Sequence, residues 1–205
     1  MTTNSGTRKR ILEAGLRVFS KKGYLGATTR EIAGEAGIAE VTLFRHFSSK
    51  EKLFEEVIHT YTFLPALKGL LPELRDMDYP GALSEIAKRF LGRLSERREL
   101  IQIMNAEVRL YPAKVKEIYH NFVDEIFRTL ASYFKELKGK GVLRDFHPEL
   151  GARAFLGMFF SYFNAREFLL QRKYPFTDES VVHEYVDIFV KGTLRAKTRQ
   201  GERKG

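Results

Sequence analysis

The stretch from residue 28 to residue 50, TTREIAGEAGIAEVTLFRHFSSK, has the residue spacing that is typical of a helix-turn-helix. Ala33 lies four residues before Gly37, and Leu43 lies six residues after it. A small residue in the first helix lets the second helix approach, a glycine adopts the left-handed turn, and an apolar residue holds the second helix in place. Because the second helix of this motif enters the major groove, the stretch predicts a protein that recognises base edges in DNA.

Positive charge is concentrated at the two ends of the sequence. Residues 1–50 contain nine Lys/Arg and four Asp/Glu, a net charge of +5, and residues 191–205 contain six and one, again +5. The residues between them carry a net charge of −1, within a total of +9. Lys and Arg displace counterions from DNA phosphates, so the N-terminal excess fits DNA binding. The far end is interpreted more simply, with residues 199–205 as a basic flexible tail.

Residues that could support catalysis or bind a metal do not cluster in the sequence. The five histidines are scattered, without HExxH or a similar ligand spacing. The sequence also lacks GxSxG, a Walker loop and GxGxxG, and Lys140 between two glycines indicates a turn. We therefore expect no enzymatic activity, no catalytic residue, no metal and no cofactor.

Composition limits the class of protein. A hydrophobic content of 43% and an aromatic content of 13% exclude a disordered chain. The absence of cysteine excludes disulfides and thiol catalysis, and it is compatible with a reducing compartment. The N-terminal segment MTTNSGTRKRILEAG has no long apolar run, and no stretch reaches the ~18 apolar residues of a membrane span. We expect a cytoplasmic protein without membrane contact.

Helical periodicity recurs throughout, and no segment predicts a β-strand, so the expected fold is all-α with about nine helices. Thr28 with Glu31 and Ser48 with Glu51 have capping-box spacing, and Gly23 is expected to end the first helix. The expected helices span residues 8–22, 28–36, 39–47, 50–64, 79–95, 99–110, 113–137, 148–172 and 178–196.

The first three helices are too short a segment to form a stable domain alone, because about 47 residues bury too little surface. They should therefore pack on the fourth helix. A shift of that fourth helix would then move the DNA-recognition helix.

The segment from Arg8 to Ile58 resembles the N-terminal domain of the TetR family of one-component transcriptional regulators. The motifs that carry this resemblance are FSKKGY, TTREIA, AGI, TLFRHF and SKEKLF. The resemblance implies a helix-turn-helix DNA-binding domain over residues 1–47. It also implies a larger helical domain over residues 48–198, which dimerises and binds a small effector.

By the same resemblance, the start of the second helix contacts phosphates and the exposed front of the third helix contacts base edges. Glu40 could accept a hydrogen bond from cytosine, repel wrong sites, or favour the helix N-terminus. Val41 and the Thr42 methyl could touch a thymine methyl. The expected DNA-binding residues are Thr28, Thr29, Arg30, Glu40, Val41, Thr42, Phe44, Arg45, His46 and Lys50.

Three of these positions carry an alternative or a departure from the family. Thr28 could serve mainly as the helix cap. Lys50 resembles the phosphate-binding lysine of the family, and its alternative is an ordinary solvated charge. Phe44 stands where the family commonly has a tyrosine, so one phosphate-binding hydroxyl is missing. Leu43 and Phe47 are expected in the core.

The last two helices are expected to form a four-helix interface with a second copy of the chain, as the resemblance implies. The segment AFLGMFFSYF is apolar on more than one face, and Gly157 would allow close approach. The alternative is a monomeric core. The expected interface residues are Phe155, Gly157, Phe160, Val182, Tyr185, Val186 and Phe189.

An effector pocket is expected among the middle helices. Its aromatic and Met stripes favour an apolar or aromatic effector, although such stripes can equally form plain core. Glu107 and Asn105 could supply a polar anchor or face solvent. The expected lining residues are Phe63, Phe90, Met104, Glu107, Phe122, Ile126, Phe159 and Phe163.

These expectations together describe a homodimeric repressor that binds a near-palindromic double-stranded operator and releases it on binding a small apolar effector. Two alternatives remain open. An architectural DNA-binding protein without an effector would be expected to carry positive charge over its whole surface. A helical adaptor that binds only proteins would leave the basic N-terminal region unexplained.

Overall fold

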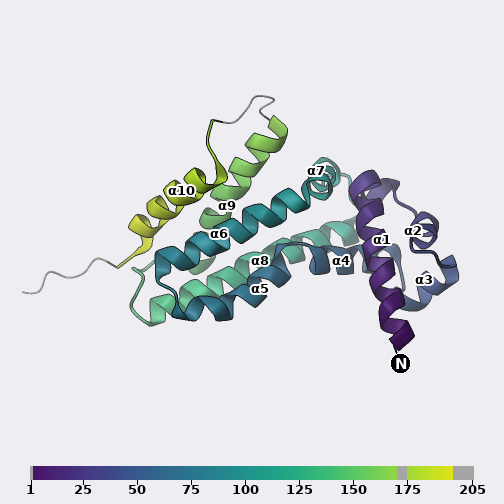
Figure 1. The fold of residues 1–205 in the computed structure, drawn as a ribbon, viewed down its shortest axis with the longest axis horizontal. Coiled ribbons are helices and arrows are strands. Elements are labelled where there is room, and N and C mark those ends of the chain that lie inside the picture. Colours follow the sequence, from purple (N-terminus) through teal and green to yellow (C-terminus); the bar gives the residue numbers. More distant parts are fainter. Residues whose placement is uncertain (1, 170–174, 196–205) are drawn as a thin grey trace, which may run out of the picture.

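The chain folds as an elongated bundle of α-helices (Figure 1). The computed structural model describes residues 2–169 and 175–195. The only β-pairing in this part of the chain is an isolated bridge between Leu143 and Leu194. The helices are α1 (Thr2–Gly26), α2 (Thr29–Glu35), α3 (Glu40–His46), α4 (Lys50–Tyr61), α5 (Phe63–Glu73), α6 (Tyr79–Glu96), α7 (Arg98–Glu107), α8 (Ala113–Gly139), α9 (Pro148–Asn164) and α10 (Asp178–Thr193). The all-α prediction is confirmed.

Local sequence signals place most helix ends. Thr28 caps α2 in a reciprocal box with Glu31, as predicted. At α4 the capping residue is Ser49, whose hydroxyl accepts from the Lys52 amide, so the prediction of Ser48 was wrong by one residue. The predicted helix over residues 50–64 is interrupted at Thr62, which is extended, and α5 begins at Phe63. Pro65 lies in the first turn of α5, where a missing N–H leaves no intrahelical bond unmade.

The helices α1, α2 and α3, here called the headpiece, pack on α4. Leu43, Phe47 and the α1 residue Phe19 are buried, and they share one apolar cluster with Leu53 and Phe54 of α4. This confirms that the fourth helix completes the headpiece core. The same cluster continues into α7 and the first half of α8, so the core does not stop at residue 47.

The remaining core lies in the body, defined as α4 to α10. Its centre consists of buried apolar side chains from α5, α6, α8, α9 and α10. Phe134 of α8, Phe155 of α9 and Phe189 of α10 meet there, with ring centroids 5.0 Å apart for Phe155 and Phe189. Figure 1 shows α8 running along most of the molecule, beneath α6 and alongside α5.

The headpiece is joined to the body by a second contact, between the end of α1 and α7. Gly23 interrupts α1 with φ 70°, and the chain then turns toward α2. Glu107 of α7 accepts a hydrogen bond from the Tyr24 amide at 2.8 Å and a longer one from the Leu25 amide at 3.4 Å. The Tyr24 ring packs edge-on against Phe54 and Tyr111. Headpiece and body are therefore held together by both polar and aromatic contacts.

The helices predicted near the end of the chain agree in part with the structure. A π-helical turn, Ala165–Leu169, continues α9 beyond Asn164. Residues 170–172 of the helix predicted over 148–172, residue 196 of the helix predicted over 178–196, and the predicted tail at 199–205 lie outside the described residues. Among the described residues, no helix is long and apolar enough to cross a membrane.

Gly23→Ala should destabilise the protein by roughly 1–3 kcal/mol. A left-handed conformation disfavours a side chain, and the new Cβ would collide with the Glu107 carboxylate. Gly92→Ala is the matched control, because Gly92 lies in α6 with open space around its Cβ. That control should be neutral or stabilising by up to about 1 kcal/mol. Urea unfolding of both variants tests this, and equal stability of the two would contradict it.

Candidate functional site

The turn between α2 and α3 has the geometry that the sequence spacing predicts. Gly37 adopts φ 64° and has open space around it. The Ile38 amide donates to the Ala33 carbonyl at 3.0 Å, which closes the end of α2. The two helices are therefore fixed relative to each other by backbone contacts.

The outer face of α3 is exposed and partly apolar. Val41 is 60% exposed and Phe44 46% exposed, while Arg45 also faces solvent. Thr42 and His46 are half-buried beside them. Leu43 and Phe47, expected in the core, are buried. The helix thus presents one face to a partner and the opposite face to the headpiece core.

Glu40 is held by residues of α2. Its carboxylate accepts from the Thr29 hydroxyl at 2.6 Å, and the Arg30 Nε lies 3.7 Å from its other oxygen. These contacts join the first turns of α2 and α3, and they leave Arg30 itself 89% exposed at the side chain. Glu40 therefore has a positioning role that the sequence analysis did not include.

Lys50 is more firmly held than either interpretation of the sequence implied. Its ammonium donates to the Tyr24 carbonyl at 2.7 Å and the Ala27 carbonyl at 2.9 Å, and it lies over the Tyr24 ring. Burial lowers the pKa of Lys50. Two of the three N–H groups of the ammonium are used in these bonds, so Lys50 positions the α1–α2 connection.

Glu51 and Tyr24 extend this contact. The Tyr24 hydroxyl donates to the Glu51 carboxylate at 2.7 Å. Hydrogen bonds from the Ser49 and Tyr24 side chains lower the pKa of Glu51 to about 2. The first turn of α4 is therefore tied to the end of α1 by a permanently charged carboxylate at neutral pH.

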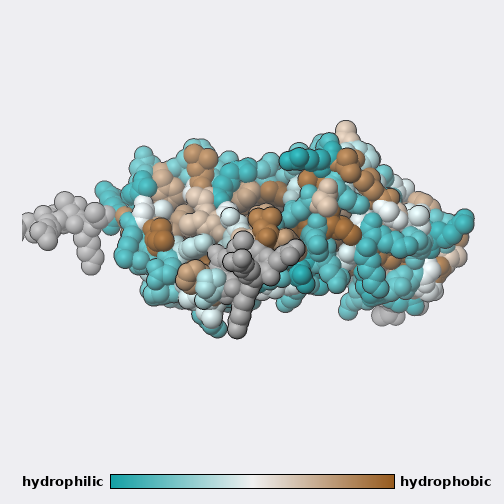
Figure 2. Space-filling model, turned by 90° about the horizontal axis from the view of Figure 1, so that it is seen from above, coloured by the Kyte–Doolittle hydropathy of each residue, from teal (hydrophilic) through white to brown (hydrophobic). Residues whose placement is uncertain are grey.

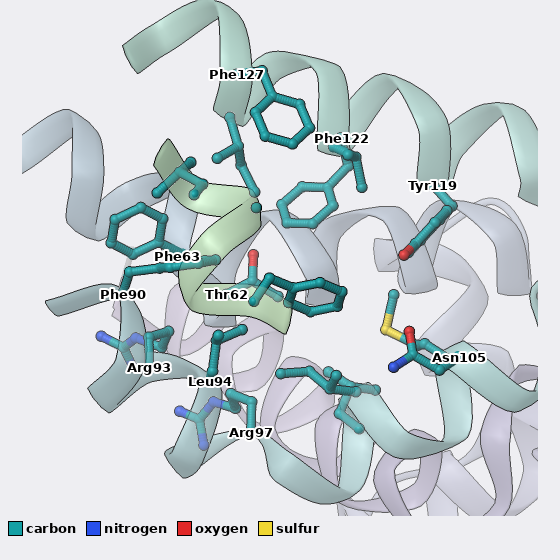
Figure 3. A pocket seen from close by; sticks show the side chains of 18 residues that line it. Thr62, Phe63, Phe90, Arg93, Leu94, Arg97, Asn105, Tyr119, Phe122 and Phe127 are labelled. Carbon is teal, nitrogen blue, oxygen red and sulfur yellow. The ribbon is translucent and has the colours of Figure 1, made fainter. Parts of the chain in front are cut away.

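Inside the body lies a cavity of about 200 Å³ (Figure 3). Aromatic and aliphatic side chains form most of its walls, and Figure 3 shows Phe63, Phe90, Phe122 and Phe127 around one end. Asn105 and Gly157, which are both exposed, line the cavity where it reaches the surface. The lining residues are Thr62, Phe63, Phe90, Arg93, Leu94, Arg97, Leu100, Ile101, Met104, Asn105, Tyr119, Phe122, Val123, Ile126, Phe127, Leu156, Gly157 and Phe160.

A few polar groups interrupt the apolar lining. The Thr62 hydroxyl donates to the Ile58 carbonyl, and in Figure 3 its oxygen points toward the cavity. The Tyr119 hydroxyl also points inward, and burial raises the pKa of Tyr119. Asn105 donates to the Asn164 side chain at 3.0 Å. An apolar cavity with a few convergent polar groups is typical of a small-molecule site.

The predicted effector residues separate into two groups. Phe63, Phe90, Met104, Phe122 and Ile126 all line the cavity. Three other positions do not line it, and the reason differs between them. Phe159 and Phe163 are fully buried in the body core, and Glu107 binds the end of α1. Asn105 lines the cavity, so it supplies the polar group that Glu107 does not.

The predicted dimer residues also divide. Phe155, Val182, Val186 and Phe189 are buried within the core of a single chain. The remaining three are accessible to different degrees. Gly157 is exposed and Phe160 half-buried, and both line the cavity. Tyr185 is half-buried against Phe159.

Other apolar side chains on α9 and α10 are exposed to solvent. On α9 and α10 they include Leu150 at 64% and Ile188 at 57% exposure. Figure 2 shows hydrophobic surface near the middle of the body, interrupted by hydrophilic side chains. Larger contiguous apolar patches mark regions where proteins associate, whereas single exposed apolar side chains are common on any protein.

Sequence reasoning missed several lining residues, notably Thr62, Arg93, Arg97 and Tyr119. Arg93 on α6 and Arg97 at its C-terminal cap are four residues apart, on the same side as Phe90 and Leu94. That spacing was the available signal. In the described part of the chain, no group of three or more His, Asp or Glu side chains could hold a metal ion.

An exposed recognition helix on a headpiece, joined to a helical body with an internal cavity, defines a ligand-responsive DNA-binding regulator. Comparison with known families agrees. Residues 11–57 match the bacterial regulatory proteins of the tetR family. Residues 81–192 match the C-terminal domain of AefR-like transcriptional repressors. The chain therefore belongs to the TetR family of transcriptional regulators.

Individual relatives share the whole architecture. The HTH-type transcriptional regulator YvkB of Bacillus subtilis is 29% identical over 186 residues, which are 91% of this chain and 96% of YvkB. A candidate TetR-family regulator from Mesorhizobium loti superimposes with a TM-score of 0.77 at 22% identity, covering 95% of this chain and 100% of the other. A candidate fatty acid metabolism regulator from Clostridium perfringens gives a TM-score of 0.70 at 26% identity, covering 91% and 100%.

Thr42→Ala and Arg45→Gln should have different effects on DNA binding. Loss of the Thr42 hydroxyl and methyl groups should relax the preference for one base pair, by about 1–3 kcal/mol of discrimination. Arg45→Gln should weaken all duplexes alike and lower the salt slope by about one, since one phosphate contact is lost. Fluorescence anisotropy with matched and scrambled duplexes at several salt concentrations measures both effects. Equal losses without any change of preference would rule out this assignment of contacts.

Proposed function

We propose that the protein is a homodimeric repressor that releases its operator when a small, largely apolar effector enters the cavity. One observation carries this proposal. The same helix, α7, lines the cavity through Leu100, Ile101 and Met104 and holds the headpiece through Glu107. A ligand that displaces α7 therefore acts directly on the end of α1.

A second connection runs through α4. The helix begins at Lys50, which holds the α1–α2 connection, and ends next to Thr62, which lines the cavity. A ligand changes the balance between two conformers only if it binds them with different affinity. We propose that the ligand-bound conformer holds α4 and α7 in positions that move the headpiece out of register with its half-site.

The proposed DNA-binding residues are those predicted from the sequence, but some of them mainly position the two helices. Val41, Thr42 and Phe44 face outward on α3 for base edges and sugars, and Arg30 and Arg45 are available for phosphates. Thr28, Thr29 and Glu40 mainly fix α2 and α3, and Lys50 combines positioning with one phosphate contact. A cytoplasmic location follows from this role.

The effector is proposed to be apolar in its main part. The cavity walls support this, since most of the lining side chains are aromatic or aliphatic. The similarity to the Clostridium perfringens protein, described as a fatty acid metabolism regulator, points in the same direction. An architectural DNA-binding protein has no use for such a cavity, so this alternative is less well supported.

Ile126→Trp should prevent effector binding while operator binding persists, because the larger side chain fills the cavity. Leu110→Trp is the control, since Leu110 is 70% exposed and lies outside the lining. The test begins with a thermal-shift screen of apolar and aromatic compounds on the unmodified protein. Compounds that stabilise it are then titrated against the complex with DNA from upstream of its own gene. Release of DNA from Ile126→Trp at unchanged concentration would refute the cavity as the effector site.

Dimerisation is proposed to use the exposed surface of α9 and α10 around Gly157, Tyr185 and Ile188. A two-fold dimer suits a near-palindromic operator with half-sites one helical turn or a multiple apart. Gly157 has open space around its Cβ position, which allows a second helix to approach closely.

Ile188→Glu should shift the protein from dimer to monomer, because a carboxylate would be buried without a partner in the interface. Leu110→Glu is the matched control on an exposed apolar residue away from α9 and α10. Light scattering coupled to size-exclusion chromatography at micromolar concentration measures the mass. A dimer that survives Ile188→Glu would contradict this interface.

A further inference from the structure

The charged side chains at the edge of the cavity are all positive. Among its lining residues, Arg93 and Arg97 are the only charged side chains, and no carboxylate lines it. Figure 3 shows both guanidinium groups at the edge of the site, directed away from the aromatic rings. A ligand that fills the apolar interior and reaches this edge would meet two positive charges.

The two arginines differ in how far their charge is already neutralised. Arg93 forms an ion pair with Glu96 at 2.8 Å. Arg97 instead donates through Nε to the Tyr61 carbonyl at 3.0 Å, and its guanidinium lies 5.8 Å from the Tyr61 ring centroid. No carboxylate of the described residues pairs with Arg97, so its two Nη groups are available to an acceptor.

The size of the interior limits the apolar group that can enter. A cavity of about 150 Å³ with similar walls holds benzene. The cavity here, about 200 Å³, is larger by a third. It therefore suits an aryl ring with a short substituent or an acyl chain of about eight carbons.

From these observations, we infer that the effector is an amphipathic anion: a short acyl or aryl group in the cavity, with an anionic group bound by Arg97. This inference rests on the proposed function, since it names the chemical class of the same effector. An anion on a guanidinium forms charge-assisted hydrogen bonds, which are stronger than neutral ones and favour bidentate oxygens.

Arg97 also connects the anion to the headpiece. The Tyr61 carbonyl lies at the last turn of α4, where carbonyl groups have no partner within the helix. Arg97 supplies that partner from the junction of α6 and α7. An anion that draws the guanidinium toward itself changes the hydrogen bond between Arg97 and the Tyr61 carbonyl. Binding of a charged ligand would therefore shift the end of α4.

The test compares ligands of equal shape and different charge on the full-length protein. Calorimetric titration of octanoate against octanamide, and of 3-phenylpropanoate against its amide, measures the preference for the anion. We expect the anion of each pair to bind at least about tenfold more tightly. Equal affinity within both pairs, or no binding of either anion, would overturn the inference.

Three variants locate the preference. Arg97→Gln retains an N–H donor for the Tyr61 carbonyl but should reduce the preference to less than about threefold. Arg97→Lys retains the charge and should recover part of it. Arg89→Gln removes an arginine one turn before Arg93, outside the cavity and paired with Glu85, and should leave it unchanged. A preference that persists in Arg97→Gln would also overturn the inference.

Two further measurements separate the sources of the anion and the two proposals. Octanoyl-coenzyme A carries its negative charge on phosphates. If it binds more tightly than octanoate and this advantage is lost in Arg97→Gln, the anionic group is a phosphate of the carrier. If octanoate binds more tightly, the anionic group is a free carboxylate. Either result supports the inference.

Operator binding is measured in parallel. If the anions bind selectively but do not release DNA, the result supports the ligand class and contradicts the release mechanism. Release by the neutral amides alone supports the release mechanism and overturns the ligand class.

Discussion

The contact between Glu107 and the amide of Tyr24 determines how the headpiece sits on the body. A carboxylate on α7 accepts from backbone groups that a bend at Gly23 exposes, and a charged acceptor makes such a bond stronger than a neutral one. The bend, the ring of Tyr24 and the ammonium of Lys50 are arranged around this point. If it is lost, the α1–α2 corner loses its polar attachment to α7, the helix that also lines the cavity.

The predictable parts of the structure are those encoded locally. The box formed by Thr28 and Glu31 and the turn at Gly37 depend on residues within a few positions of each other, and both were found from sequence. The end of α4 was missed because Pro65 is compatible with the first turn of a new helix as well as with a kink. Helix propensity alone does not distinguish the two.

The site residues that escaped prediction depend on contacts between distant segments. Glu107 and Tyr24 are 83 residues apart, so no periodicity links them. Phe155 and Val182 belong to apolar faces, and such a face has the same sequence pattern whether it packs on its own chain or on a second copy. Arg97 lines a cavity that exists only where α5, α6, α7, α8 and α9 come together.

The length of α8 has a consequence for how the molecule unfolds. Its 27 residues extend over roughly 40 Å. The first half, through Val115 and Phe122, belongs to the apolar cluster of the headpiece, and the second half, through Leu130 and Phe134, belongs to the core of the body. Ile126 packs against both clusters. A helix shared in this way couples the melting of one core to that of the other, so the chain should behave as one cooperative folding unit although it carries two functions.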